Sequence, residues 1–286
     1  MQAGAAALRT TARVVAEAVS AWRRDDALRL GAALSYYTAF SLAPVLIVSV
    51  GVAGLVFGAE AASGRIVAEL RGLMGPDGAK AIQTLIEHAS LRPGAGWAAT
   101  LFGVGTILFG ASGAFAELQH ALNSIWDVEP PRRSSWLTTL RSRLLSFSMV
   151  LAIGFLLLVS LVISAALAGL DDVFGEVGRL QPLLAVANGA LSWIVIAVLF
   201  ALIFRVLPDR RIPWRDIWPG AATAALLFVL GKFVIGFYIG NTSVASVYGA
   251  ASSLAVLLVW VYYSAQSLFL GAEVSQALCR QREVCT

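Results

Sequence analysis

Long apolar runs alternate with short charged segments along the whole chain. A transmembrane helix needs about 20 mainly apolar residues, because each residue advances about 1.5 Å and the hydrocarbon core is about 30 Å thick. Six runs reach that length, and they cover residues 28–57, 97–118, 144–170, 183–207, 218–239 and 247–270. The pattern therefore predicts an all-α polytopic membrane protein with about six transmembrane helices and amphipathic interfacial helices.

The same pattern divides the chain into three parts. We expect residues 1–27 to form a cytoplasmic amphipathic segment, residues 28–278 a single six-helix membrane domain, and residues 279–286 a cytoplasmic tail. Residues 58–96 form the sizeable loop and are expected in the periplasm. Two short amphipathic stripes flank a Gly-Pro pair in this loop, which predicts two helices separated by a turn. The loop is either a lid over the helices or a passive connector.

Composition agrees with a membrane domain. Hydrophobic residues make up 58% of the chain and charged residues 13%, whereas a soluble domain carries roughly a quarter charged residues. Lipid must therefore be the solvent for much of the surface. The two cysteines, Cys279 and Cys285, match no disulfide framework and no zinc-binding spacing, so we expect reduced thiols.

The basic residues predict the orientation of the chain. Fifteen of them fall in the segments on one side of the predicted helices, and five fall in the segments on the other side. Cytoplasmic loops carry the excess of lysine and arginine. Both termini are therefore expected in the cytoplasm.

The N-terminal segment has the pattern of an amphipathic helix. Leu8, Ala12, Val15, Val19 and Trp22 recur every three or four residues and form one apolar face. Such a helix can lie in the membrane interface against anionic headgroups, or it can be a cytosolic helix packed on the bundle. The sequence leaves both interpretations open.

Small residues line one face of the second predicted span. Gly96, Gly103, Gly110 and Gly113 recur at helical spacing, and Glu117 follows near the inner end. Stripes of small residues let two helices pack closely where lipid is the solvent. We therefore assign the glycines to helix packing. Glu117 leaves a second interpretation, in which the stripe lines a groove that admits a ligand.

A polar stripe runs along the last predicted span. Tyr248, Tyr262, Gln266 and Glu273 fall on one side of this helix. Polar groups inside a membrane must face protein or water rather than lipid. The stripe is either a hydrated path or a set of hydrogen bonds between helices.

Lys232 and two tyrosines complete the predicted substrate path or lipid-binding residues. Lys232 lies inside the fifth apolar run, where it either extends to the interface or binds a carboxylate or an anionic headgroup. Tyr36 and Tyr37 lie in the first run, shortly before Pro44. Hydroxyl groups beside a proline bend either line a cavity, as in transporters, or hydrogen-bond the backbone groups that the proline frees.

Four segments carry a family resemblance. They are residues 30–44 (LGAALSYYTAFSLAP), 122–128 (LNSIWDV), 206–220 (VLPDRRIPWRDIWPG) and 247–278 (VYGAASSLAVLLVWVYYSAQSLFLGAEVSQAL). In this order they resemble the YihY/BrkB family of bacterial inner-membrane proteins, formerly labelled ribonuclease BN. The resemblance implies a six-helix fold with cytoplasmic ends and a link to envelope lipid homeostasis. It marks residues 36–38, Lys232, Tyr248, Gly249 and residues 271–273 as positions of the family pattern.

Two hypotheses of function follow. The leading one is passive transport or flipping of a phospholipid or another amphipathic envelope molecule, with membrane lipids as partners. The alternative is a non-transporting scaffold or regulator of envelope assembly, which binds an envelope protein or a second copy of itself.

Other functions find no support in the sequence. No spacing places a base beside a nucleophile, so we predict no catalytic residues. We predict no cofactor and no metal, since His88 and His120 fall on opposite sides of the membrane. The arginines follow the membrane topology and form no nucleic-acid patch with interleaved aromatic residues.

Overall fold

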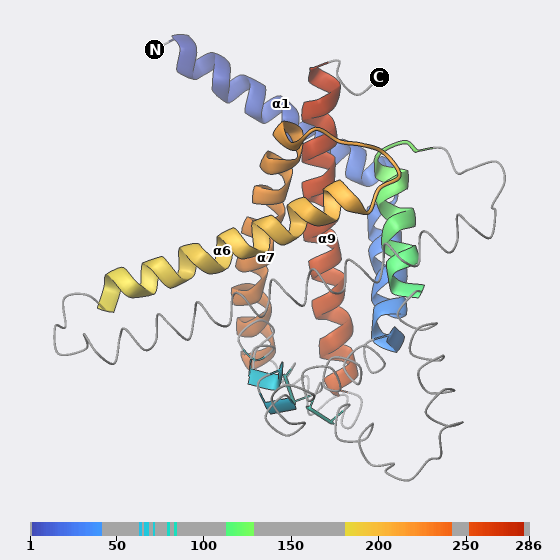
Figure 1. The fold of residues 1–286 in the computed structure, drawn as a ribbon, viewed down its shortest axis with the longest axis vertical. Helices are drawn as coiled ribbons and strands as arrows, with labels where there is room; N and C mark the ends of the chain where they lie inside the picture. The colour runs from blue at the N-terminus through green and yellow to red at the C-terminus, as the bar shows by residue number, and fades with distance from the viewer. Residues whose placement is uncertain are drawn as a thin grey trace. The chain divides into compact units, whose positions relative to one another are not determined.

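The computed structural model describes residues 2–41, 113–128, 181–241 and 252–282, together with short stretches between 63 and 84. Every regular element in these residues is an α-helix, which confirms the all-α prediction for this part of the chain. The labelled helices in Figure 1 are α1 (Gln2–Arg24), α6 (Gln181–Val206), α7 (Trp214–Asn241) and α9 (Ser252–Gln281). Two more helices cover residues 27–41 and 113–125.

Two described helices are long and apolar enough to cross a membrane. These candidate spans are Trp214–Ile235 of α7 and Leu254–Gln281 of α9, while Ser192–Val206 of α6 is apolar but shorter. The predicted span 144–170, the second half of 28–57 and most of 97–118 lie outside the described residues. The count of six spans therefore stays a prediction.

Helix α9 extends further than the last apolar run predicts. The run ends at residue 270, whereas the helix continues to Gln281. The sequence pattern stops early because polar residues begin to recur there, but Glu273, Ser275 and Gln276 are buried in the structure. Packing against neighbouring segments, rather than hydropathy, maintains this part of the helix.

The chain forms two compact units, each assembled from separate stretches. The first contains Met1–Asp25, Leu122–Val229 and Ser267–Thr286, and the second contains Asp26–Ala121 and Leu230–Gln266. Helices α7 and α9 contribute residues to both units. The divisions expected from the sequence, at residues 27 and 278, stay predictions.

In the first unit, α1 packs against the C-terminal part of α9 (Figure 1). Val14 and Ala18 are buried against Val274 and Ala277. The apolar face that the sequence indicated is a different one, because Val15 is 51% exposed. Packing on other helices is thus observed for one face of α1, while the apolar face that the sequence suggested is largely open.

A short turn connects α6 to α7. Helix α7 begins after Pro213, whose carbonyl oxygen accepts hydrogen bonds from the backbone N–H groups of Asp216 and Ile217. Arg205, near the end of α6, donates a hydrogen bond to the carbonyl oxygen of Ile212. Its guanidinium also lies 5.8 Å from the ring centroid of Trp214, within the range of a cation–π contact. Arg205 therefore holds both ends of the turn together.

The expectation of reduced thiols is wrong for Cys279, which is disulfide-bonded in the structure. The other cysteine, Cys285, lies outside the described residues. The expectation rested on the spacing patterns of disulfide frameworks and zinc sites. Those patterns carry no information about a single bond near the end of a chain.

Candidate functional site

The buried polar face of α9 contains the strongest candidate residue of the first unit. Glu273 is 0% exposed, and no N–H group of the described residues donates a hydrogen bond to either oxygen of its carboxyl group. Asp25 interacts with it through its charge and through a side-chain hydrogen bond between the two carboxyl groups, and Arg280 and Arg24 act on it through their charges. A buried ionisable group that receives no hydrogen bond from an N–H group is costly and rare, so its presence calls for a reason other than stability.

Next to this face, Asp127 connects α9 to the end of helix 113–125. Its Oδ2 accepts hydrogen bonds from Gln276 Nε2 at 3.1 Å and from Arg280 Nη2 at 2.6 Å. Asp127 has a φ of 50°, in the left-handed region that Asp tolerates better than most residues. The chain can therefore turn out of the helix while the carboxylate stays directed at α9.

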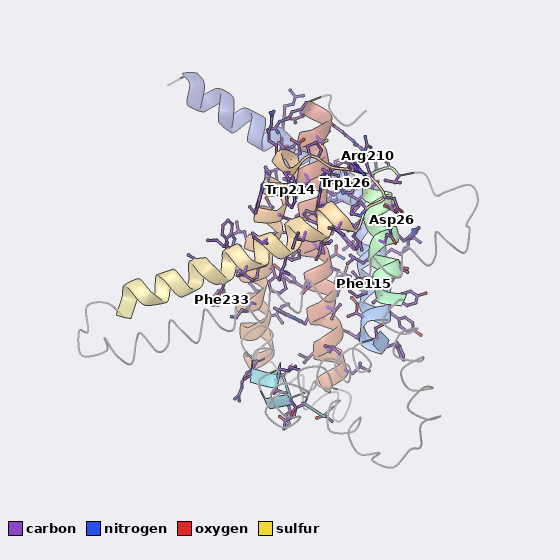
Figure 2. All side chains as sticks on the ribbon, in the orientation of Figure 1. Asp26, Phe115, Trp126, Arg210, Trp214 and Phe233 are labelled. Atoms are coloured by element: carbon purple, nitrogen blue, oxygen red, sulfur yellow. The ribbon has the colours of Figure 1, made fainter. Side chains whose placement is uncertain are left out.

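The segment around Asp127 is also joined to the turn between α6 and α7. Asn123 Nδ2 donates to Asp209 Oδ2 at 2.8 Å, and the backbone N–H of Asp209 donates to Asn123 Oδ1 at 2.9 Å. Arg210 donates to the carbonyl oxygen of Trp126 at 3.4 Å, and Figure 2 labels both residues. Two short segments far apart in sequence are thus fixed to each other.

The start of α7 is tied to α9 in the same unit. Asp216 is buried and forms an ion pair with Arg282, and the Ser275 hydroxyl donates to the carbonyl oxygen of Ile217 at 3.3 Å. Three of the four segments that carry the family resemblance therefore meet in the first unit. Sequence reasoning did not assign a role to these polar residues, although the motifs LNSIWDV and VLPDRRIPWRDIWPG contain most of them.

In the second unit, Gln266 and Tyr262 lie together beside Gly31. Gln266 Nε2 donates to the carbonyl oxygen of Ala27 at 3.1 Å. A Cβ added to Gly31 would lie 3.2 Å from Gln266 Cδ and 3.5 Å from the Tyr262 ring, and would clash with the Gln266 amide nitrogen. The hydrogen-bonding interpretation of the polar stripe therefore holds for Gln266, and Gly31 provides the space for it.

Tyr36 and Tyr37 are exposed side chains on helix 27–41. The Tyr36 ring lies 5.8 Å from the Tyr37 ring and 4.8 Å from the Phe40 ring, measured between centroids. A Cβ on Gly113 would lie 3.5 Å from the Tyr37 ring, which is ordinary van der Waals contact. The aromatic side chains form an open surface. A larger residue than glycine at position 113 would fit against the Tyr37 ring.

Lys232 is exposed on α7, inside a candidate span. Its neighbours Leu230, Phe233 and Val234 are exposed as well, and Phe233 is labelled in Figure 2. Gly231 faces the opposite way, because a Cβ on it would overlap the Tyr263 ring. Lys232 thus lies on an apolar, unpacked face and forms no ion pair with a described residue.

The remaining predicted site residues are only partly covered by the structure. Glu117 is half-buried on helix 113–125. Tyr248, Gly96, Gly103 and Gly110 lie outside the described residues, so their predicted roles are untested. Within the part of the chain that the structure describes, no group of three or more His, Cys, Asp or Glu side chains could hold a metal ion.

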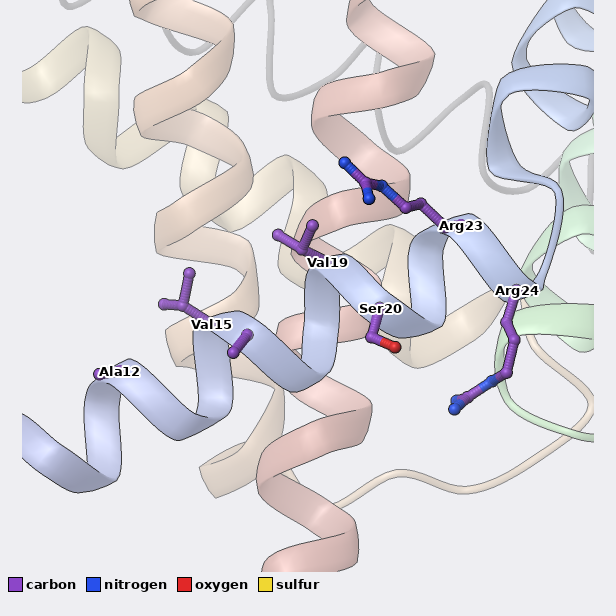
Figure 3. Close-up of a pocket in the computed structure, with 7 residues that line it drawn as sticks. Ala12, Val15, Val19, Ser20, Arg23 and Arg24 are labelled. Atoms are coloured by element: carbon purple, nitrogen blue, oxygen red, sulfur yellow. The ribbon is translucent and has the colours of Figure 1, made fainter.

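A groove runs along the open face of α1 (Figure 3). It has a volume of about 1040 Å³. Its lining combines small apolar side chains with a hydroxyl and two guanidinium groups: Ala12, Val15, Ala16, Val19, Ser20, Arg23 and Arg24. In Figure 3, Val15, Val19 and Arg23 point to the same side of the helix.

Comparison with known families gives one match over most of the chain. Residues 18–284 match the family model described as Virulence factor BrkB. No solved structure matches the chain.

Several curated bacterial proteins are similar over nearly the whole chain. A UPF0761 membrane protein of Alkalilimnicola ehrlichii is 27% identical over 259 residues, which cover 90% of this chain and 56% of the relative. UPF0761 membrane proteins of Xanthomonas axonopodis and Stenotrophomonas maltophilia are 29% and 28% identical, and the matches cover 95% and 96% of this chain and 63% of each relative. The chain therefore spans less than two thirds of the length of these relatives.

Proposed function

The chain belongs to the Virulence factor BrkB family of membrane proteins, and from this premise we propose that it moves a phospholipid or another amphipathic envelope molecule passively across the bacterial inner membrane. Both termini lie in the cytoplasm under this proposal, and membrane lipids are the partners. The proposal assigns no catalytic residues, no cofactor and no nucleic-acid partner.

The observation that supports the proposal most is the burial of Glu273. It lies on α9, in a candidate span, and neither oxygen accepts a hydrogen bond from an N–H group of the described residues. Ionisable groups at such positions are expensive in membrane proteins and usually mark a pathway for a polar substrate. A polar headgroup that passes along the buried face of α9 would supply the missing hydrogen-bond donor for a short time.

Lys232 supports the choice of lipid as the substrate class. It is a cation on an otherwise apolar, exposed face of α7. Lipid phosphates are the anions that such a face meets in a membrane. The alternative role, in which the side chain extends to the interface without binding anything specific, predicts no effect of its removal on lipid retention.

A scaffold for envelope assembly is the second candidate. Two features favour it: α7 and α9 pack too closely at Gly220 and Gly271 to leave space between them, and Tyr36 and Phe40 expose aromatic surface that a partner protein or a second copy could cover. Exposed aromatic patches are common at binding interfaces. In this case the burial of Glu273 would serve specificity of packing rather than transport.

The two functions are distinguished by a vesicle assay. The full chain is reconstituted into vesicles of phosphatidylethanolamine and phosphatidylglycerol that contain a trace of fluorescent phosphatidylglycerol. A membrane-impermeant reductant then quenches the outer leaflet. We expect the protein to accelerate the loss of inner-leaflet fluorescence, and Glu273→Gln to abolish the acceleration. Glu17→Gln, which removes a carboxylate from the surface of α1, is the matched control and should behave as the wild type.

The opposite result is equally informative. If correctly folded protein moves no lipid faster than protein-free vesicles do, the transport proposal is wrong. Crosslinking in native membranes, followed by identification of a stoichiometric envelope protein or a stable homo-oligomer, would then support the scaffold.

A further inference from the structure

Helix α1 has two apolar faces, and only one of them is packed. Val14 and Ala18 are buried against α9, whereas Ala12, Val15 and Ala16 remain exposed on the other side. The open face continues through Val19 to Arg23, at spacings of three and four residues along the helix. An amphipathic stripe of this kind, left uncovered, is characteristic of helices that contact lipid.

The groove on this open face has a lining that complements an anionic lipid. Ala12, Val15 and Val19 give it an apolar lining, and Arg23 and Arg24 follow at one end, where the Arg23 side chain points to the side of Val15 and Val19 and the Arg24 side chain points away from it (Figure 3). No carboxylate lines it, and the neighbouring Glu17 is hydrogen-bonded to Gln281 of α9 at 3.5 Å. Arg23 forms no ion pair with a described residue, so its guanidinium group can bind an anion, whereas Arg24 also acts on the buried Glu273 through its charge.

The contact between α1 and α9 fixes the groove near one end of a candidate span. Val274 and Ala277, which touch α1, belong to the last turns of Leu254–Gln281. The ends of spans lie at the level of the lipid headgroups. An apolar groove that ends in arginines is therefore presented where phosphates and the upper parts of acyl chains are found.

We propose that this groove binds one anionic phospholipid, with an acyl chain along Ala12, Val15 and Val19 and the phosphate on the Arg23 guanidinium. Arg24 lies at the same end and adds positive charge. The volume of about 1040 Å³ is slightly above the roughly 300–1,000 Å³ of small-ligand pockets, which suits a long amphipathic molecule. The inference rests on the proposed function for the assumption that lipids are the natural ligands, and it adds a specific site and a charge preference.

The site is tested by lipid titration of the full chain. Detergent-solubilised protein is titrated with phosphatidylglycerol or phosphatidylcholine, and retained lipid is counted by native mass spectrometry. We expect phosphatidylglycerol to bind in preference to phosphatidylcholine. Arg23→Ala should weaken phosphatidylglycerol binding about fivefold, the usual effect of one basic residue at an anionic lipid surface, whereas Arg23→Lys should retain most of the affinity. Arg13→Ala removes the same charge from the same helix outside the groove and should leave binding unchanged.

Two results would overturn the site. Equal weakening by Arg13→Ala and Arg23→Ala would mean that α1 attracts anionic lipid only through its overall charge. Equal retention of the two lipids, with no effect of Arg23→Ala, would mean that the Arg23 guanidinium holds no phosphate and that the groove does not prefer an anionic lipid. Failure of the proposed function is recognised separately: protein that moves no lipid in vesicles, yet binds phosphatidylglycerol through Arg23, supports this site and contradicts transport.

Discussion

Gly271 of α9 lies so close to Gly220 of α7 that a Cβ atom on Gly271 would be 2.6 Å from the Gly220 carbonyl oxygen. The same Cβ would be 2.6 Å from the Cβ of Ala224. Neither atom belongs to the end of a flexible side chain, so a methyl group here requires the backbones to separate. Close approach of backbones through glycine is a usual device of helix packing in membranes, and it gives a physical reason for glycine at position 271.

Gly271→Ala is therefore expected to destabilise the protein by about 1–3 kcal/mol, the usual cost of inserting a methyl group into a packed interface. Thermal unfolding of the detergent-solubilised protein measures the effect. Gly189→Ala is the matched control, because no atom lies within 4 Å of a Cβ at that position of α6. It should stabilise slightly, since alanine is the better helix former. Equal shifts in Tm for the two variants would show that the α7–α9 crossing is not tight.

The two arginines at the end of α9 should differ strongly in their importance. Arg282 pairs with Asp216, whose side chain is 3% exposed, whereas Arg280 pairs with Asp127, whose side chain is 64% exposed. Removal of Arg282 leaves a buried carboxylate without its partner, which should lower the free energy of unfolding by about 1.5–3 kcal/mol. Removal of Arg280 leaves a hydrated carboxylate and costs about 0.2–1 kcal/mol.

Unfolding midpoints of Arg282→Ala and Arg280→Ala, measured side by side, test this difference. If Arg280→Ala is the more damaging variant, then solvent does not reach Asp127 as the structure indicates. In that case the Asp127 contacts with Gln276 and Arg280, and not the Asp216 pair, would be the main connection between α9 and the rest of the first unit.

The Gly31–Gln266 contact predicts a non-additive pair of mutations. Gly31→Ala displaces the Gln266 amide and removes its 3.1 Å hydrogen bond to Ala27, so we expect a loss of about 0.5–1.5 kcal/mol. Gln266→Ala removes the same bond and opens space for a methyl group at position 31. Gln266→Ala should therefore lower the free energy of unfolding much less in a Gly31→Ala background than in the wild type. Additive effects in a double-mutant cycle would show that the two positions act independently.

Hydropathy predicted the positions of several helices. A helix that crosses a membrane needs a long apolar run, and such runs are visible in the sequence. Runs 183–207 and 218–239 match the described parts of α6 and α7 closely. The run at 247–270 indicated α9 but missed its polar end, since Glu273 and Gln276 are buried by other segments. Which face of a helix packs also depends on its partners: the sequence indicated an apolar face through Val15 and left open whether it meets lipid or protein, whereas Val14 and Ala18 are the packed residues.

The polar network of the first unit was harder to foresee. It depends on pairs such as Asn123 with Asp209, which are far apart in sequence and have no periodic pattern. A signal was available at Asp127, because an Asp directly after a helix often adopts the left-handed conformation that ends it. The choice of Lys232 and Glu273 as candidates came from their unusual chemistry inside apolar runs, and their surroundings could be known only from the packing.

Substitution of Glu273 is expected to affect stability and function in opposite directions. Its buried carboxyl group receives no hydrogen bond from an N–H group of the described residues, so Glu273→Met, which has a side chain of similar length and removes the polar group, should raise the free energy of unfolding by about 1–3 kcal/mol. Gln276→Met is the control on the same helix: its side chain is also buried but donates to Asp127, so the same change should lower stability by about 0.5–1.5 kcal/mol. Opposite shifts in Tm, together with loss of lipid movement in Glu273→Met, would indicate that the carboxylate is kept for function at a cost in stability. A destabilised Glu273→Met would instead mean that the carboxylate is bound and structural, and it would remove the main support for a polar path along α9.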